Sequence, residues 1–187
     1  MDAHPETRVI EGIEPLSQPP FGMAPDRTVP EPLQEVLFGQ LPDGSIPSAW
    51  ALLDAARIPQ LPDRIERSGL PYACLFTNAA KTDLGDVAPW LVELRDGDEF
   101  PRELFTEVPG GRLPSMLGGR IPGLLVRAEG PCERLWQHLR KFTRLRDARE
   151  NWHFLRFWEP RSAFHYLAGP HPLTTSLLSG CSAIVAV

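Results

Sequence analysis

Charged residues surround an abrupt turn in the stretch FLRFWEPRSAFHYLAG, which spans residues 154–169. The residues before the turn alternate as in a β-strand, which places Arg156 on the same side as Phe154 and Trp158. A guanidinium on an otherwise apolar face is typical of two situations. One is the edge of a catalytic centre, and the other is a polar joint between structural elements.

A joint requires a carboxylate partner for Arg156, because an unpaired buried charge costs several kcal/mol. The candidates are Glu159 and Asp54, the latter at the end of an earlier apolar run. Pro160 stops the hydrogen bonding of the strand and starts a helix, so Glu159 and Arg161 are left at the corner. We therefore favour a structural polar joint of Asp54, Arg156, Glu159 and Arg161 over a catalytic centre.

Two other groups of residues are candidates for catalytic chemistry. Cys132 lies at a predicted helix start, where the helix N-terminus can lower the pKa of a thiol and make it reactive. Packing at the helix start is the alternative that we favour. Asp83 and Asp86 lie in a predicted loop that includes residues 80–86, where carboxylates are usually solvated. A small hydrolase or transferase that uses one of these groups is an alternative function.

Patterns for metal, cofactor or serine chemistry are missing from the sequence. The five histidines form no HExxH, HxH or His–Cys pair, and there is no GxSxG motif. The glycine-rich segment PGGRLPSMLGGRIPG, residues 109–123, lacks the lysine and the spacing of a phosphate-binding loop, so we predict a surface loop. We therefore expect no metal and no cofactor, and we assign no catalytic residue from these patterns.

A cluster of cations lies in the second half of the helix predicted over residues 131–147 and just beyond it: Arg140, Lys141, Arg144, Arg146 and Arg149. Cations gather in the last turns of a helix because they complement its dipole and stay in water, which is one explanation. The other is that they bind phosphate, RNA or an acidic protein face. No base-stacking or base-reading motif accompanies the charges, so we expect no nucleic acid and assign partner binding to Arg140, Arg144 and Arg149.

The bulk composition is that of an ordinary globular protein. The 187 residues are 42% hydrophobic and 23% charged, with a net charge of -5 that favours neither nucleic acid nor an anionic membrane. The N-terminal MDAHPETRVIEG lacks the features of a signal peptide, and no apolar run approaches the roughly 18 residues of a membrane span. We therefore expect a cytoplasmic protein with no membrane partner and with reduced thiols.

The order of predicted elements indicates the α/β class. Prolines concentrate in residues 1–47, so residues 1–29 are predicted to form a proline-rich N-terminal arm and residues 30–187 a single lobe. Strand patterns occur at 48–54, 70–76, 88–94, 123–129, 152–158 and 181–187. Helix patterns occur at 30–40, 61–69, 98–108, 131–147, 160–169 and 171–180. This alternation predicts a mixed β-sheet flanked by helices.

Five segments carry a resemblance to a known family. They are VLFG at 36–39, WALLDAARIPQLPDRIERSGLPYACLF at 50–76, DVAPWLVEL at 86–94, LWQHLRKFTRLRD at 135–147 and LRFWEPR at 155–161. In this order they resemble the type VI secretion effector adaptors, or chaperones, that share domain of unknown function 4123. The genes of that family typically lie between those of a VgrG spike protein and a toxin effector.

The resemblance implies a protein-binding role without catalysis. Such an adaptor holds the N-terminal region of its cognate toxin effector and delivers it to the C-terminal end of the VgrG spike before secretion. An immunity-type protein, which would bind the toxic domain and neutralise it, is the alternative in the same class.

Overall fold

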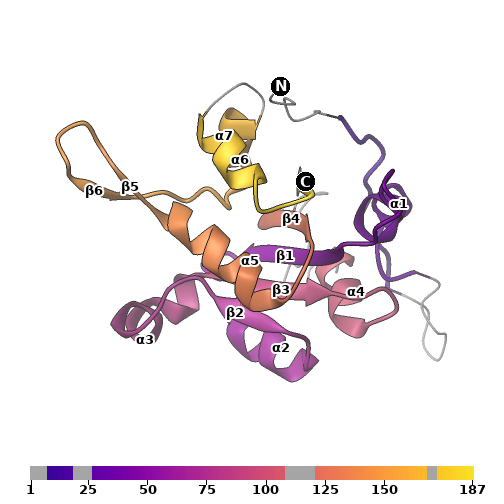
Figure 1. Cartoon of the computed structure of the whole chain (residues 1–187). Helices are drawn as coiled ribbons and strands as arrows, with labels where there is room; N and C mark the ends of the chain where they lie inside the picture. Colours follow the sequence, from indigo (N-terminus) through magenta and orange to yellow (C-terminus); the bar gives the residue numbers. More distant parts are fainter. Residues whose placement is uncertain (1–7, 19–26, 108–120, 168–171) are drawn as a thin grey trace.

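Strand β1 (Ser48–Asp54) is the central strand of a five-stranded sheet, and six of its seven residues are buried. This burial follows from the continuous apolar run AWALL, which suits a strand that is covered on both faces. Figure 1 shows this sheet in a computed structural model. The structure describes residues 8–18, 27–107, 121–167 and 172–187. The strand order of the sheet is β2-β3-β1-β4-β7, where the other strands are β2 (Tyr72–Cys74), β3 (Pro89–Leu94), β4 (Gly123–Ala128) and β7 (Ala183–Ala186).

Each neighbouring pair in this sheet is antiparallel. Helix α2 (Leu61–Ser68) lies between β1 and β2 in the sequence, but β3 lies between these two strands in the sheet. Likewise α4 (Glu99–Phe105) lies between β3 and β4 in the sequence, but β1 lies between these two strands in the sheet. The two β-α-β units are therefore interleaved, as in the ferredoxin-like arrangement. This confirms the α/β class with helices beside a sheet, and the interleaving makes the sheet antiparallel where a mixed one was expected.

Helices cover both faces of the sheet. On β1, Ala51 and Leu53 point into one core and Trp50 and Leu52 into the other. The first core is closed by α1 (Glu31–Phe38), α2 and α4, which contribute Leu33, Ile65 and Leu104. The second is closed by α5 (Cys132–Leu139), α6 (Pro160–Leu167) and α7 (Pro172–Leu178), which contribute Leu135, Ala163 and Leu177. Figure 1 shows α5 crossing in front of the strands.

The helix predicted over residues 131–147 is wrong in its second half. Helix α5 ends at Leu139, a 3₁₀ turn η2 (Arg140–Thr143) follows, and the chain then forms the hairpin of β5 (Arg144–Arg146) and β6 (Trp152–Phe154). In this hairpin Arg144 pairs with Phe154 and Arg146 with Trp152. Each arginine thus covers an aromatic ring across the strands, a contact that a continuous helix would not provide.

The predicted strand over residues 152–158 is correspondingly short. Only Trp152–Phe154 is a strand, and it belongs to the separate hairpin, which projects away from the main sheet in Figure 1. A second difference lies in the predicted loop that includes residues 80–86, where helix α3 (Ala79–Leu84) and a 3₁₀ turn, η1 (Gly85–Val87), are present. Residues 109–120 of the predicted glycine-rich loop lie outside the described residues.

Part of the predicted N-terminal arm lies along the body of the protein. Ile10, Ile13 and Leu16 pack against the first core, and the Leu16 amide donates a hydrogen bond of 2.8 Å to the Phe105 carbonyl. Residues 1–7 and 19–26 of the predicted arm lie outside the described part. Among the described residues no helix is both long enough and apolar enough to cross a membrane.

Candidate functional site

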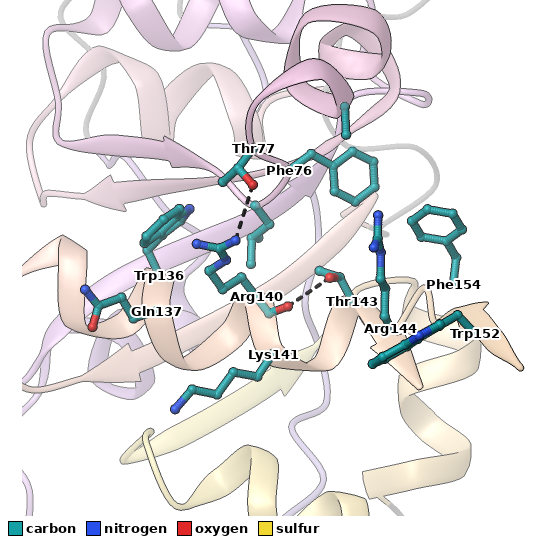
Figure 2. Close-up of a pocket in the computed structure, with 12 residues that line it drawn as sticks. Phe76, Thr77, Trp136, Gln137, Arg140, Lys141, Thr143, Arg144, Trp152 and Phe154 are labelled. Atoms are coloured by element: carbon teal, nitrogen blue, oxygen red, sulfur yellow. Dashed lines mark hydrogen bonds between the residues drawn. The ribbon is translucent and has the colours of Figure 1, made fainter. Parts of the chain in front are cut away.

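A groove of about 610 Å³ lies between α5–η2 and the segment that follows β2 (Figure 2). The β5–β6 hairpin forms its third side. The lining residues come from three parts of the chain: Leu75, Phe76, Thr77 and Ala80; Trp136, Gln137, Arg140, Lys141, Thr143 and Arg144; and Trp152 and Phe154. The groove therefore exists only because the chain leaves helical geometry after Leu139 and turns back as a hairpin.

Helix α5 determines how the first side of the groove is built. Leu135 and Leu139 point into the core, while Trp136 and Arg140 occupy a neighbouring face one turn apart. The Trp136 indole donates a hydrogen bond of 2.7 Å to the Cys74 carbonyl, which fixes the ring against the sheet. The Arg140 guanidinium lies 4.5 Å from the centre of this ring. A fixed indole thus holds the arginine by a cation–π contact.

The hairpin repeats this pairing of a cation with an aromatic ring. The Arg144 guanidinium lies 5.1 Å from the centre of the Phe154 ring, and Arg146 lies 5.0 Å from that of Trp152. Phe154 and Trp152 are each 62% exposed although both are large and apolar. On the inner side, Phe76 contacts Phe154 with their ring centres 6.0 Å apart. The groove is consequently rimmed by aromatic surface that the described residues leave open to solvent.

The charged residues that line the groove are all cations. Arg140 donates a hydrogen bond of 3.2 Å to the neutral hydroxyl of Thr77. No ion pair joins Arg140, Lys141 or Arg144 to a carboxylate among the described residues. The Glu133 carboxylate accepts a 2.8 Å hydrogen bond from the side-chain amide of Gln137, one helical turn later. The groove is therefore a site of uncompensated positive charge in a chain whose net charge is -5.

The three arginines assigned to partner binding do not all meet here. Arg140 and Arg144 line the groove, whereas Arg149 lies in the turn of the hairpin, where its amide donates to a carboxylate oxygen of Asp147 at 2.8 Å. The sequence reasoning missed the aromatic members of the site. The four-residue spacing of Trp136 and Arg140 was a signal for one of them, because such a spacing stacks side chains on a helix.

The predicted polar joint is present in part, at the end of β1. Asp54 is 1% exposed and accepts a hydrogen bond from Arg156, and it is one of the two carboxylates that the sequence offered as a partner. Arg57, which was not predicted, lies 3.9 Å from the Asp54 carboxylate and 3.2 Å from that of Glu159. Glu159 thus joins the network through Arg57, a residue whose position three places after Asp54 could have indicated its role.

Arg161 is the member of the predicted joint that lies apart. Its exposed side chain lines a second groove of about 800 Å³ together with Phe164, Pro160 and Val187, among others. No ion pair with Arg161 is found among the described residues. The corner therefore holds Asp54, Arg57, Arg156 and Glu159 together and directs Arg161 outward.

The candidate catalytic groups lie on separate elements, with Cys132 at the start of α5 and Asp83 and Asp86 in α3 and η1. Burial, and then the nearby carboxylates of Glu133 and Glu93, raise the pKa of the Cys132 thiol, which is opposite to the activation of a nucleophile. Asp83 and Asp86 are both exposed, the first on α3 and the second in η1. In the described part of the chain, no three histidine, cysteine or carboxylate side chains are grouped as metal ligands would be.

Comparison with curated proteins gives no match, and comparison with solved structures gives none either. A family model does match, over residues 49–173, which is about two thirds of the chain. The matched range begins in β1 and includes all three sides of the groove as well as the Asp54–Arg156 pair. The family is that of the Domain of unknown function (DUF4123), and this chain belongs to it.

Proposed function

We propose that this protein is an adaptor that binds a type VI secretion effector and helps to load it onto the C-terminal end of the VgrG spike. The proposal places the adaptor in the cytoplasm, where it holds the N-terminal region of the effector before secretion. Membership of the family and the ordered motifs from VLFG to LRFWEPR support this role. The observation that carries it is the exposed groove lined by Trp136, Arg140, Arg144 and Phe154.

The composition of the groove is that of a protein-binding surface. Tryptophan and arginine are enriched among the residues that dominate protein–protein binding, because they bury a large area and still offer polar contacts. Trp152 and Phe154 expose 62% of their surface each, which favours a partner that covers them. Nothing comparable supports the hydrolase or transferase alternative, since the Cys132 thiol has a raised pKa.

Co-expression of residues 1–187 with the effector encoded beside it tests the proposal. Two forms of the effector are needed, one full-length and one without its N-terminal segment, followed by size-exclusion chromatography with light scattering. The adaptor role predicts a stable complex with the full-length form alone. A complex that forms equally well without the N-terminal segment, and that suppresses toxicity, would instead indicate an immunity protein.

Loading requires a second measurement with the spike. Pull-down of the effector by the C-terminal end of VgrG is expected to depend on the presence of this chain. An effector that binds the spike equally well without the chain would contradict the loading step. Absence of any complex between the chain and either form of the effector would contradict the adaptor role itself.

A further inference from the structure

The groove bounded by Trp136 and Phe154 has a charge that selects its occupant. Its cations are Arg140, Lys141 and Arg144, and no carboxylate lines it among the described residues. Of the acidic residues on the neighbouring elements, Glu133 accepts a hydrogen bond from the Gln137 side chain and Asp147 accepts from the turn of the hairpin. An occupant with carboxylates would therefore meet positive charge without competition from the protein.

The arginines of the groove keep the donors that a carboxylate needs. A guanidinium carries five N–H donors, and a cation–π contact does not require any of them. Arg140 uses one of its terminal nitrogens for Thr77, and Arg144 lies over Phe154 with no described carboxylate partner. Each arginine can thus donate to a carboxylate through its remaining N–H groups, while a ring holds its position.

The aromatic rim requires a second property of the occupant. Phe76 and Phe154 meet at a 53° angle, and Trp152 lies beyond them on the same side of the groove. Figure 2 shows these rings near Arg144, away from Trp136. An apolar side chain placed beside them would remove both its own surface and theirs from water, at about 25 cal/mol for each Å² of apolar area buried.

We propose that this groove binds an acidic segment of the partner protein, whose carboxylates pair with Arg140 and Arg144 while an apolar side chain packs against Phe76, Trp152 and Phe154. That the partner is the effector rests on the proposed function. The chemistry of the segment is assigned by the groove itself.

A single-stranded nucleic acid is the other polyanion that combines negative charge with apolar surface. Its bases bind by stacking on open aromatic faces, and its backbone follows an extended basic path. Here an arginine already lies over one face of Trp136, Phe154 and Trp152, so each ring offers a base less open surface than a free stacking platform would. The net charge of -5 also gives the chain no overall attraction for a polyanion. These observations favour an acidic protein segment.

The test is a titration of the whole chain, residues 1–187, with labelled synthetic peptides followed by fluorescence anisotropy. One peptide combines glutamate and aspartate with leucine and phenylalanine. A second has lysine in place of the acids, and a third has serine in place of the apolar residues. We expect the first to bind at least about tenfold more tightly than either of the others, because both the carboxylates and the apolar group contribute.

Variants locate the binding in the groove. The double change Arg140→Gln and Arg144→Gln removes both charges, and we expect the acidic apolar peptide to bind at least about tenfold more weakly. Arg140→Lys with Arg144→Lys keeps the charge but loses the planar edge, so an intermediate loss is expected. The matched control is Arg134→Gln, an exposed arginine in the first turn of α5 that does not line the groove. Circular dichroism checks that each variant is folded.

Several results would overturn the inference. They are absence of binding by the acidic apolar peptide, equal binding of the three peptides, and unchanged affinity in the double glutamine variant. A single-stranded oligonucleotide that binds more tightly than the peptide would assign the groove to nucleic acid instead. If the effector complex forms but survives the double variant, the adaptor role stands and the groove assignment falls. If no effector complex forms, the peptide titration still decides what the groove binds.

Discussion

The carboxylate of Asp54 accepts a hydrogen bond from the guanidinium of Arg156, which lies 102 positions later in the chain. Asp54 is the last residue of the central strand and is almost fully buried, whereas about half of the Arg156 side chain is exposed. Arg57 bridges Asp54 to Glu159, at the residue before α6. The network thus fastens the end of the hairpin segment and the start of α6 to the sheet.

Replacement of Arg156 by alanine is expected to lower the free energy of unfolding by about 1–2 kcal/mol. Its removal leaves the buried carboxylate of Asp54 with a more distant cation, Arg57, and with the Ala56 amide. Urea denaturation followed by circular dichroism measures the change. Arg161→Ala is the control and should change stability by less than about 0.5 kcal/mol. Equal effects of the two substitutions would contradict the structural role given to Arg156.

A methyl group at Gly123 is expected to disturb the pairing of β4 with β1. A Cβ at this position would lie 2.1 Å from the carbonyl oxygen of Leu52 and 2.9 Å from the Cα of Leu53, both part of the central strand. Gly123→Ala should therefore cost about 2–3 kcal/mol of unfolding free energy, because backbone must shift to relieve the clash. Thermal or urea denaturation measures it.

Gly85→Ala is the matched control for Gly123→Ala. No atom lies within 4 Å of a Cβ built at Gly85, and its backbone has φ -55° and ψ -37°, which suits alanine. This substitution is expected to be neutral or to stabilise the protein by up to about 1 kcal/mol, since alanine restricts the unfolded chain. A destabilised Gly85→Ala variant together with a stable Gly123→Ala variant would contradict the pairing of β4 with β1.

The turn of the β5–β6 hairpin is expected to loosen in acid. Hydrogen bonds from His153 and from the Asn151 amide lower the pKa of Asp147 from 3.8 to about 2. Because the pKa is lower in the folded protein, the ionised carboxylate stabilises the turn above about pH 4, and this contribution is lost as the pH falls through 2. Nuclear magnetic resonance of the Arg149 and Asn151 amides between pH 5 and pH 2 follows the change.

Asp147→Asn provides the comparison for that titration. The variant lacks the carboxylate of Asp147, so the transition assigned to Asp147 should be absent from the same amide signals. A transition in the wild-type chain centred near pH 4 would mean that Asp147 titrates as in an unfolded peptide. The hydrogen bonds that order the turn would then be absent in solution.

The Cys132 thiol is expected to react with iodoacetamide more slowly than a free cysteine does at pH 8. Burial and the carboxylates of Glu133 and Glu93 raise its pKa, so less thiolate is present at a given pH. Mass spectrometry of the labelled peptides gives the rate for each cysteine. Cys181, whose pKa is raised to about 12 by burial, should be slower than a free cysteine as well. A Cys132 that outpaces free cysteine would restore the hydrolase or transferase alternative.

At the start of α6, beside the second groove, the side chains of Glu159 and Arg161 point in different directions. Glu159 turns toward Arg57 and also accepts a hydrogen bond of 2.9 Å from the Ser162 hydroxyl, while Arg161 faces outward. The sequence placed all four members of the predicted joint at or near this corner. The direction of each side chain depends on how the first turn of α6 lies against the end of β1, and these two elements are far apart in the sequence.

The apolar patterns of the sequence determined the elements of the sheet. The run from Ser48 to Asp54 was predicted as a strand with the bounds that it has, and α2 was predicted to within one residue of its end at Ser68. These predictions succeed because burial on two faces and the stop at Gly69 are recorded in neighbouring residues. The α/β class follows from their order alone.

Only the tertiary structure decided the pairing of the strands and the shape of the groove. The residues from Arg140 to Arg146 continue a helical pattern locally, yet they turn into a hairpin in which Arg144 and Arg146 cover Phe154 and Trp152. Likewise, Arg140 meets Thr77 and Asp54 meets Arg156 across more than sixty positions. Such contacts depend on which segments the folded chain brings together, and a local pattern carries no information about that.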